Sequence, residues 1–125
     1  MDETTVLVCD DDREIVDAIE IYLSQDGYKI YKAYDGEQAI QILDKEDIHL
    51  LIMDIMMPVM GGLEATHMIR TMDHPDSDKV PIIAISANAF DEDQRMAYEA
   101  GVDEYLIKPV ESKQLYKALH SIKNP

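Results

Sequence analysis

The stretch VLVCDDD, residues 6–12, places three acids directly after four apolar residues, and LLIMD, residues 50–54, repeats the pattern with one acid. A short continuous apolar run of this kind is typical of a buried strand. A carboxylate at the end of such a strand is costly unless a cation pairs with it. We therefore expect Asp10, Asp11 and Asp54 to converge on a metal site that contains a reactive aspartate.

Size and composition narrow the class of protein. The chain has 125 residues, one cysteine and a formal net charge of −15. This length predicts a single domain over residues 1–125. Such an acidic surface repels nucleic acid, so we expect no direct binding of DNA. No apolar stretch reaches the ~18 residues of a membrane span, and the N-terminus does not resemble a signal peptide, so we expect a cytoplasmic location.

Strand-like and helix-like segments alternate along the whole chain. Five β-α units without a long linker predict an α/β fold, a doubly wound five-stranded parallel sheet with helices on both faces. The flavodoxin-like strand order 2-1-3-4-5 is the better match for five strands. The expected strands are residues 6–9, 29–33, 50–53, 81–85 and 104–107, and the expected helices are residues 13–25, 37–45, 62–72, 91–100 and 112–123.

In that order, the carboxyl ends of four strands lie in a row at the edge where open α/β sheets bind ligands. The residues that follow these strands are, in order, Asp10 and Asp11, Asp54, Ser86, and Lys108. Mg²⁺ suits the carboxylates, whereas a hydroxyl and an ammonium hold anionic oxygens. A phosphoryl group needs both kinds of partner around one carboxylate, and carboxylates are covalent phosphoryl acceptors.

Simpler interpretations exist for several of these residues. Asp12 is better explained as the N-cap of the following helix than as a metal ligand. Cys9 is better explained as a small core residue than as a reactive thiol. Tyr105 suits a core aromatic with its hydroxyl at the surface, and Lys108 alone suits a surface lysine. A position at the end of a strand before Pro109 favours a functional role for Lys108.

Five motifs occur in a fixed order along the chain, in or just after four of the expected strands. They are Asp10-Asp11, Asp54 with Met57-Pro58 and Gly62 downstream, Ser86-Ala87, Tyr105, and Lys108-Pro109. With these motifs the chain, from Val6 to about Ile122, closely resembles the receiver domain of bacterial two-component response regulators. The resemblance implies a signalling switch in a phosphorelay rather than an enzyme, one that assists its own phosphorylation and dephosphorylation.

The resemblance also implies a role for each residue of the site. Asp54 would be the phosphoacceptor, with Lys108 contacting the phosphoryl oxygens. Mg²⁺ would be held by Asp11 directly, by Asp10 mainly through water, by Asp54, and by the backbone carbonyl of Met56. Because an apolar side chain at Met56 cannot orient an attacking water, we hypothesise that Asn88 has more influence on phosphoryl lifetime.

A switch and its partners follow from the same resemblance. Ser86 would move to the phosphoryl oxygens, Tyr105 would turn inward, and the surface formed by residues 91–123 would repack. The bond between Lys108 and Pro109 would be cis. The donor would be a phosphohistidine on a sensor histidine kinase or a phosphotransfer protein, and a phosphorylated homodimer is a further expectation.

Other functions on the same fold fit less well. A flavodoxin needs a Ser/Thr/Gly-rich phosphate loop after the first strand, where this chain has three acids. A phosphatase with an aspartate nucleophile needs an acid two residues later, where this chain has Met56. The parent protein stays open between a DNA-binding response regulator, favoured by residues 1–62, and a hybrid histidine kinase, favoured by ISANA at 85–89. The chain is then either a single-domain regulator or an excised receiver.

Overall fold

All neighbouring strands pair in parallel in the order β2-β1-β3-β4-β5, which confirms the predicted doubly wound α/β fold. The computed structural model describes residues 4–57, 61–71, 80–88 and 90–123. Its strands are β1 (Thr5–Cys9), β2 (Lys29–Ala33), β3 (Leu50–Asp54), β4 (Ile82–Ser86) and β5 (Glu104–Ile107). Its helices are α1 (Arg13–Ser24), α2 (Gly36–Lys45), α3 (Gly62–Thr71), α4 (Asp91–Ala100) and α5 (Ser112–Lys123).

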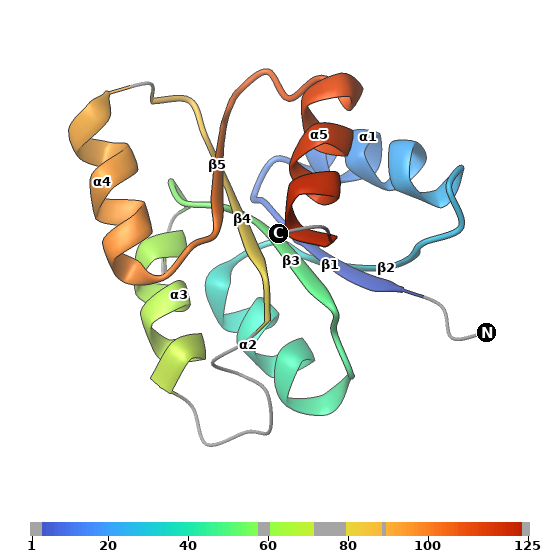
Figure 1. Cartoon of the computed structure of the whole chain (residues 1–125). Helices are drawn as coiled ribbons and strands as arrows, with labels where there is room; N and C mark the ends of the chain where they lie inside the picture. Colours follow the sequence, from blue (N-terminus) through green and yellow to red (C-terminus); the bar gives the residue numbers. More distant parts are fainter. Residues whose placement is uncertain (1–3, 58–60, 72–79, 89, 124–125) are drawn as a thin grey trace.

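Two hydrophobic cores lie on opposite faces of the sheet. Alternate residues of each strand point to opposite faces, so Leu7 and Leu51 belong to one core while Val8 and Ile52 belong to the other. The first core packs against α2, α3 and α4, and the second against α1 and α5 (Figure 1). Because β1, β3 and β4 are buried throughout, they read as continuous apolar runs in the sequence.

The register of the sheet places the carboxyl ends of the central strands level with one another. Cys9 pairs with Met53, Met53 pairs with Ala84, and Ser86 pairs with Ile107. The residues that follow these positions therefore share one edge of the sheet, as the sequence predicts. This edge carries the candidate functional site.

Gly62 lets α3 begin directly against the end of β3. A Cβ atom added at Gly62 would lie 2.5 Å from the backbone oxygen of Asp54 and 2.5 Å from the Cα of Ile55. Thr66 donates a hydrogen bond of 2.7 Å to the carbonyl of Gly62 within the first turn. A glycine is thus needed here because of close backbone packing beside Asp54.

Arg70 ties the end of α3 to the end of α4. Its guanidinium donates to the carbonyls of Val80 at 2.7 Å and Gly101 at 2.8 Å, and it pairs with Asp103 at 3.1 Å. Gly101 ends α4 in the left-handed region with φ of +119°. The side-chain bonds of Arg70 therefore hold the C-terminal end of α4 against its neighbours.

The predicted element boundaries differ from the structure by at most one residue. Helix α1 ends at Ser24, and Asp54 is the last residue of β3 rather than the residue after it. Strand β4 likewise includes Ser86 and begins at Ile82 instead of Pro81. In the described part of the chain, no helix has the length and apolar character that crossing a bilayer requires.

Candidate functional site

Three carboxylates meet at the carboxyl edge of the sheet. Asp10, Asp11 and Asp54 each offer one oxygen, and these oxygens lie within 4.8 Å of one another. Asp10 is fully buried and Asp54 is 2% exposed, whereas Asp11 is exposed. The cluster is therefore open to solvent on the side of Asp11, and its oxygens are the ligands that a hard divalent cation prefers.

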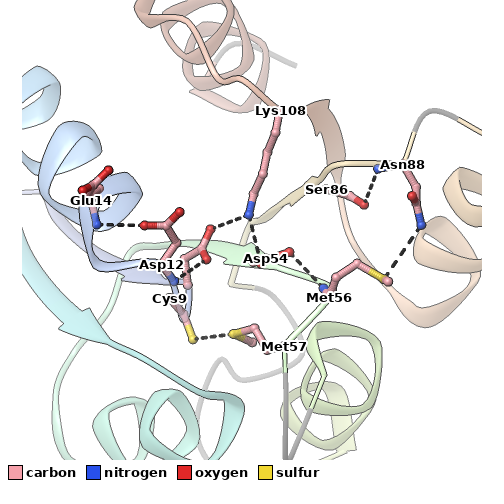
Figure 2. Close-up of polar contacts among 10 residues, drawn as sticks. Cys9, Asp12, Glu14, Asp54, Met56, Met57, Ser86, Asn88 and Lys108 are labelled. Atoms are coloured by element: carbon pink, nitrogen blue, oxygen red, sulfur yellow. Dashed lines mark hydrogen bonds and ion pairs between the residues drawn. The ribbon is translucent and has the colours of Figure 1, made fainter.

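Lys108 lies between the two buried carboxylates. Its Nζ is 3.0 Å from Oδ2 of Asp10 and 3.0 Å from Oδ2 of Asp54. Figure 2 shows its side chain extending from the loop after β5 to Asp54. The backbone N–H of Lys108 donates to the carbonyl of Ser86 at 2.8 Å, and the peptide bond to Pro109 is cis, as predicted. The sequence predicts Lys108 beside Asp54, but it does not predict the contact with Asp10.

Backbone N–H groups fix the orientation of the buried acids. The N–H of Asp12 donates to Oδ1 of Asp10, and the N–H of Met56 donates to Oδ1 of Asp54, both at 2.9 Å. Asp12 itself accepts a hydrogen bond of 3.0 Å from the N–H of Glu14, which confirms its predicted role as the N-cap of α1 (Figure 2). In each buried acid, Oδ2 is therefore the oxygen that faces the ammonium.

The charges of the site perturb one another. Burial raises the pKa of Asp10 to about 6, against the lowering effects of the Asp12 N–H and the Lys108 ammonium. Burial opposes the charge of Lys108, but the carboxylates of Asp10 and Asp54 raise its pKa above the ordinary value. Two buried acids therefore share one cation, which leaves negative charge uncompensated within the cluster.

One oxygen of this cluster is a test of whether a metal fits. Oδ2 of Asp10 is buried, and among the described residues its partner is the Lys108 ammonium 3.0 Å away, which Asp54 shares. Two buried carboxylates with one shared cation are incompletely compensated. A divalent cation among Asp10, Asp11 and Asp54 would give this oxygen a strong partner, so the residues present fit a magnesium site.

Ser86 and Tyr105 line the side of the site next to β4. Ser86 is fully buried, and its Oγ accepts a hydrogen bond of 3.0 Å from the N–H of Asn88. The hydroxyl of Tyr105 donates to the carbonyl of Asn88 at 2.9 Å, and the ring is buried. The turn of Tyr105 on phosphorylation stays a prediction. Both residues of the predicted switch pair meet at Asn88.

Met56 reaches across the mouth of the site toward Asn88. The side-chain amide of Asn88 donates to the sulfur of Met56 at 3.9 Å (Figure 2). Met56 is 59% exposed, so its side chain is open to solvent. The sequence places both residues near the acceptor, but only the structure reveals that they touch.

Cys9 lies behind the site in the core, as predicted. Its single S–H lies within reach of two acceptors, the carbonyl of Asp35 at 3.2 Å and the sulfur of Met57 at 3.6 Å. Burial and the nearby acids Asp35 and Asp10 raise the pKa of the thiol well above its ordinary value. The thiol therefore stays protonated and unreactive.

Comparison with known proteins gives a consistent family. The family model described as the response regulator receiver domain matches residues 6–120. The transcriptional regulatory protein CpxR of Escherichia coli is 32% identical over 117 residues, which cover 94% of this chain and 48% of CpxR. The hybrid signal transduction histidine kinase I of Dictyostelium discoideum is 35% identical over 121 residues, covering 93% of this chain and 7% of the kinase. The chain thus spans about half or less of these relatives.

Solved structures agree with the sequence relatives. The chemotaxis protein CheY4 of Vibrio cholerae is 26% identical with a TM-score of 0.90, over 97% of this chain and 99% of that one. The receiver domain of the sensor histidine kinase PA1611 from Pseudomonas aeruginosa is 30% identical with a TM-score of 0.86, over 98% and 100% of the two chains. That domain holds a magnesium ion in its active-site cleft.

Proposed function

Because this chain belongs to the family of response regulator receiver domains of two-component systems, we propose that Asp54 accepts a phosphoryl group from a phosphohistidine. The single observation that carries the proposal is the placement of Asp54. Its carboxylate is nearly buried at the end of β3, between an acidic cluster and the Lys108 ammonium 3.0 Å away. An acid so placed combines a nucleophile with charge compensation for a phosphoryl group.

In the proposed transfer, an oxygen of Asp54 attacks phosphorus while the P–N bond to the donor histidine breaks. The electron pair of that bond stays with the imidazole nitrogen, and an aspartyl phosphate forms. The N–H of Met56 holds the carboxylate in place, and Lys108 neutralises negative charge on the phosphoryl oxygens. The domain is therefore a signalling module that assists a transfer rather than a classical enzyme.

We assign a magnesium ion to Asp10, Asp11, Asp54 and the backbone carbonyl of Met56. The proximity of the three carboxylate oxygens, and the single ammonium that the two buried acids share, support this assignment. When bound, the ion would supply a second positive charge besides Lys108, which would stabilise the charge of the transferring group. Lys108 would then be released from Asp10 and would serve Asp54 alone.

The proposed output begins at Ser86. Its hydroxyl would turn from the N–H of Asn88 toward a phosphoryl oxygen, because a charged acceptor forms the stronger hydrogen bond. Since the hydroxyl of Tyr105 is bonded to the carbonyl of Asn88, a change at Ser86 would reach Tyr105 through one residue. The surface formed by α4, β5 and α5 would then change its population of conformers.

Partners follow from the family and remain proposals for this chain. Membership of two-component systems implies a histidine kinase as the partner, and a phosphotransfer protein or a phosphorylated homodimer are further proposals. The net charge of −15 speaks against direct contact of this domain with DNA. CpxR and the hybrid kinase represent the two proposed kinds of parent protein, a DNA-binding regulator and a hybrid kinase.

The acceptor is tested by mass spectrometry of the intact protein after incubation with acetyl phosphate and Mg²⁺. The unmodified chain should gain one phosphoryl group. The Asp54→Asn variant should gain none, because the side-chain amide does not attack phosphorus as a carboxylate does. Asp12→Asn is the matched control, because it removes an equal charge from a capping residue two positions past Asp10. Continued phosphorylation of Asp54→Asn would contradict the assignment.

A further inference from the structure

Met56 carries a thioether at the mouth of the proposed acceptor site in a position open to oxidants. Its side chain is 59% exposed, whereas the neighbouring Met53 is fully buried and Met57 is 8% exposed. The sulfur of Met57 also lies in the core, 3.6 Å from the thiol of Cys9. Of the described methionines beside Asp54, Met56 is thus the one that a dissolved oxidant reaches first.

The surroundings of the Met56 sulfur favour an oxidised product. The side-chain amide of Asn88 already points its N–H at this sulfur from 3.9 Å. A thioether is a weak acceptor, but the oxygen of a sulfoxide is a strong one. The same amide is therefore placed to bind a sulfoxide oxygen on Met56, which would stabilise the oxidised side chain across the site.

We propose that Met56 is a reversible oxidation site through which peroxides shorten the lifetime of the phosphoryl group on Asp54. This inference rests on the proposed function of Asp54. In the modification, the sulfur lone pair attacks one oxygen of a hydroperoxide and the O–O bond breaks. Sulfur gains the oxygen and loses two electrons, and the peroxide is reduced to water or an alcohol. A thiol-dependent methionine sulfoxide reductase reverses the step.

The effect on lifetime follows from the change in hydrogen bonding. Hydrolysis requires a water molecule that attacks phosphorus, breaks the bond to Asp54 and releases phosphate. The thioether of Met56 cannot orient this water, but a sulfoxide oxygen accepts a hydrogen bond from it. The expected acceleration is on the order of threefold to tenfold, below the ~10²-fold of a positioned general base, because a sulfoxide orients the water without deprotonating it.

The experiment compares the reduced and the peroxide-treated chain. Peptide mass spectrometry should find a gain of one oxygen at Met56 before Met53 and Met57. The chain is then phosphorylated with acetyl phosphate and Mg²⁺, the donor is removed, and loss of phosphate is followed. Loss should be faster after peroxide and should return to the original rate after treatment with the reductase.

Matched variants separate Met56 from other sites. Peroxide should not change phosphate loss in Met56→Leu, but it should accelerate loss in Met68→Leu, which removes a methionine 41% exposed on α3. Met56→Gln, whose amide oxygen imitates the sulfoxide, should lose phosphate faster without peroxide. The inference is overturned if Met53 or Met57 is oxidised first, or if peroxide accelerates loss equally in Met56→Leu. Absence of phosphorylation in the untreated chain would instead overturn the proposed function.

Discussion

Replacement of Asp10 by asparagine is expected to stabilise the folded chain at neutral pH when no divalent metal is present. Asp10 is fully buried, and its carboxylate shares the Lys108 ammonium with Asp54. Asparagine keeps the shape of the side chain and an oxygen for the N–H of Asp12, while the flexible Lys108 side chain can turn from the new amide NH2 to Asp54 alone. It also removes the buried charge, so the folded variant is free of the energetic cost of an ionised side chain at position 10 inside the protein.

The size of the gain follows from the pKa of Asp10, which rises from 3.8 to about 6 on folding. At 1.36 kcal/mol for each pH unit, this rise makes the ionised acid about 3 kcal/mol less favourable in the folded chain than in the unfolded chain. Because the pKa of Asp10 is higher in the folded chain, its protonation stabilises the folded chain. This stabilisation is complete below pH 3.8 and is lost as the pH rises through about 6. The advantage of Asp10→Asn should therefore be about 3 kcal/mol at ~pH 8 and close to zero at ~pH 4.

Urea denaturation in EDTA measures this difference in the free energy of unfolding at both pH values. Asp12→Asn is the control, since it removes an equal surface charge and keeps a good N-cap residue, so it should change stability by less than ~0.5 kcal/mol. Saturating Mg²⁺ should reduce the difference in stability between Asp10→Asn and the unmodified chain. The metal binds the three acids of the unmodified chain more tightly than the two acids that the variant keeps, and so stabilises the unmodified chain more. An equal gain at both pH values, or no gain at ~pH 8, would refute the assigned cause.

Two further substitutions test the packing and the charges around Asp54. Lys108→Ala should lower the free energy of unfolding in EDTA by about 3 kcal/mol, because two buried carboxylates lose their shared cation. Mg²⁺ should restore more stability to this variant than to the unmodified chain. An unchanged urea midpoint would contradict this expectation. Gly62→Ala should cost about 2 kcal/mol and slow phosphorylation by acetyl phosphate, because its Cβ meets the backbone of Asp54 at 2.5 Å. Gly61→Ala, whose Cβ lies 3.2 Å from the carbonyl of Ile55, should be milder, and an equal loss in both would argue against a specific contact.

The sheet and its order were predictable because buried parallel strands leave a simple record in the sequence. The apolar runs of β1, β3 and β4 end in polar residues, and the strand order then brings those residues to one edge. Because strand order depends on the backbone alone, Asp10, Asp54 and Lys108 could be assigned to this edge without any knowledge of side-chain conformation. Boundaries were less certain, since Asp54 and Ser86 proved to belong to their strands.

Contacts that depend on side-chain conformation were not predictable. Lys108 was expected beside Asp54, but the length of its flexible side chain also lets it reach Asp10. The bond from Tyr105 to the carbonyl of Asn88 joins strand β5 to a residue 17 positions earlier, just after β4, and no local pattern encodes it. The same holds for the contact between Asn88 and Met56, which pairs two residues 32 positions apart.

The bonds of Arg70 have a mechanical consequence for α4. They hold the C-terminal end of this helix at Gly101, while its N-terminal end begins at Asp91, five residues after β4 ends at Ser86. The helix has ten residues, is therefore about 15 Å long, and would pivot about its fixed end at Gly101. A displacement at Asn88 would become a tilt of α4, largest next to the acceptor and smallest at the far end. A partner that docks on α4 would thus distinguish the two states by the orientation of the helix rather than by its distance from the sheet.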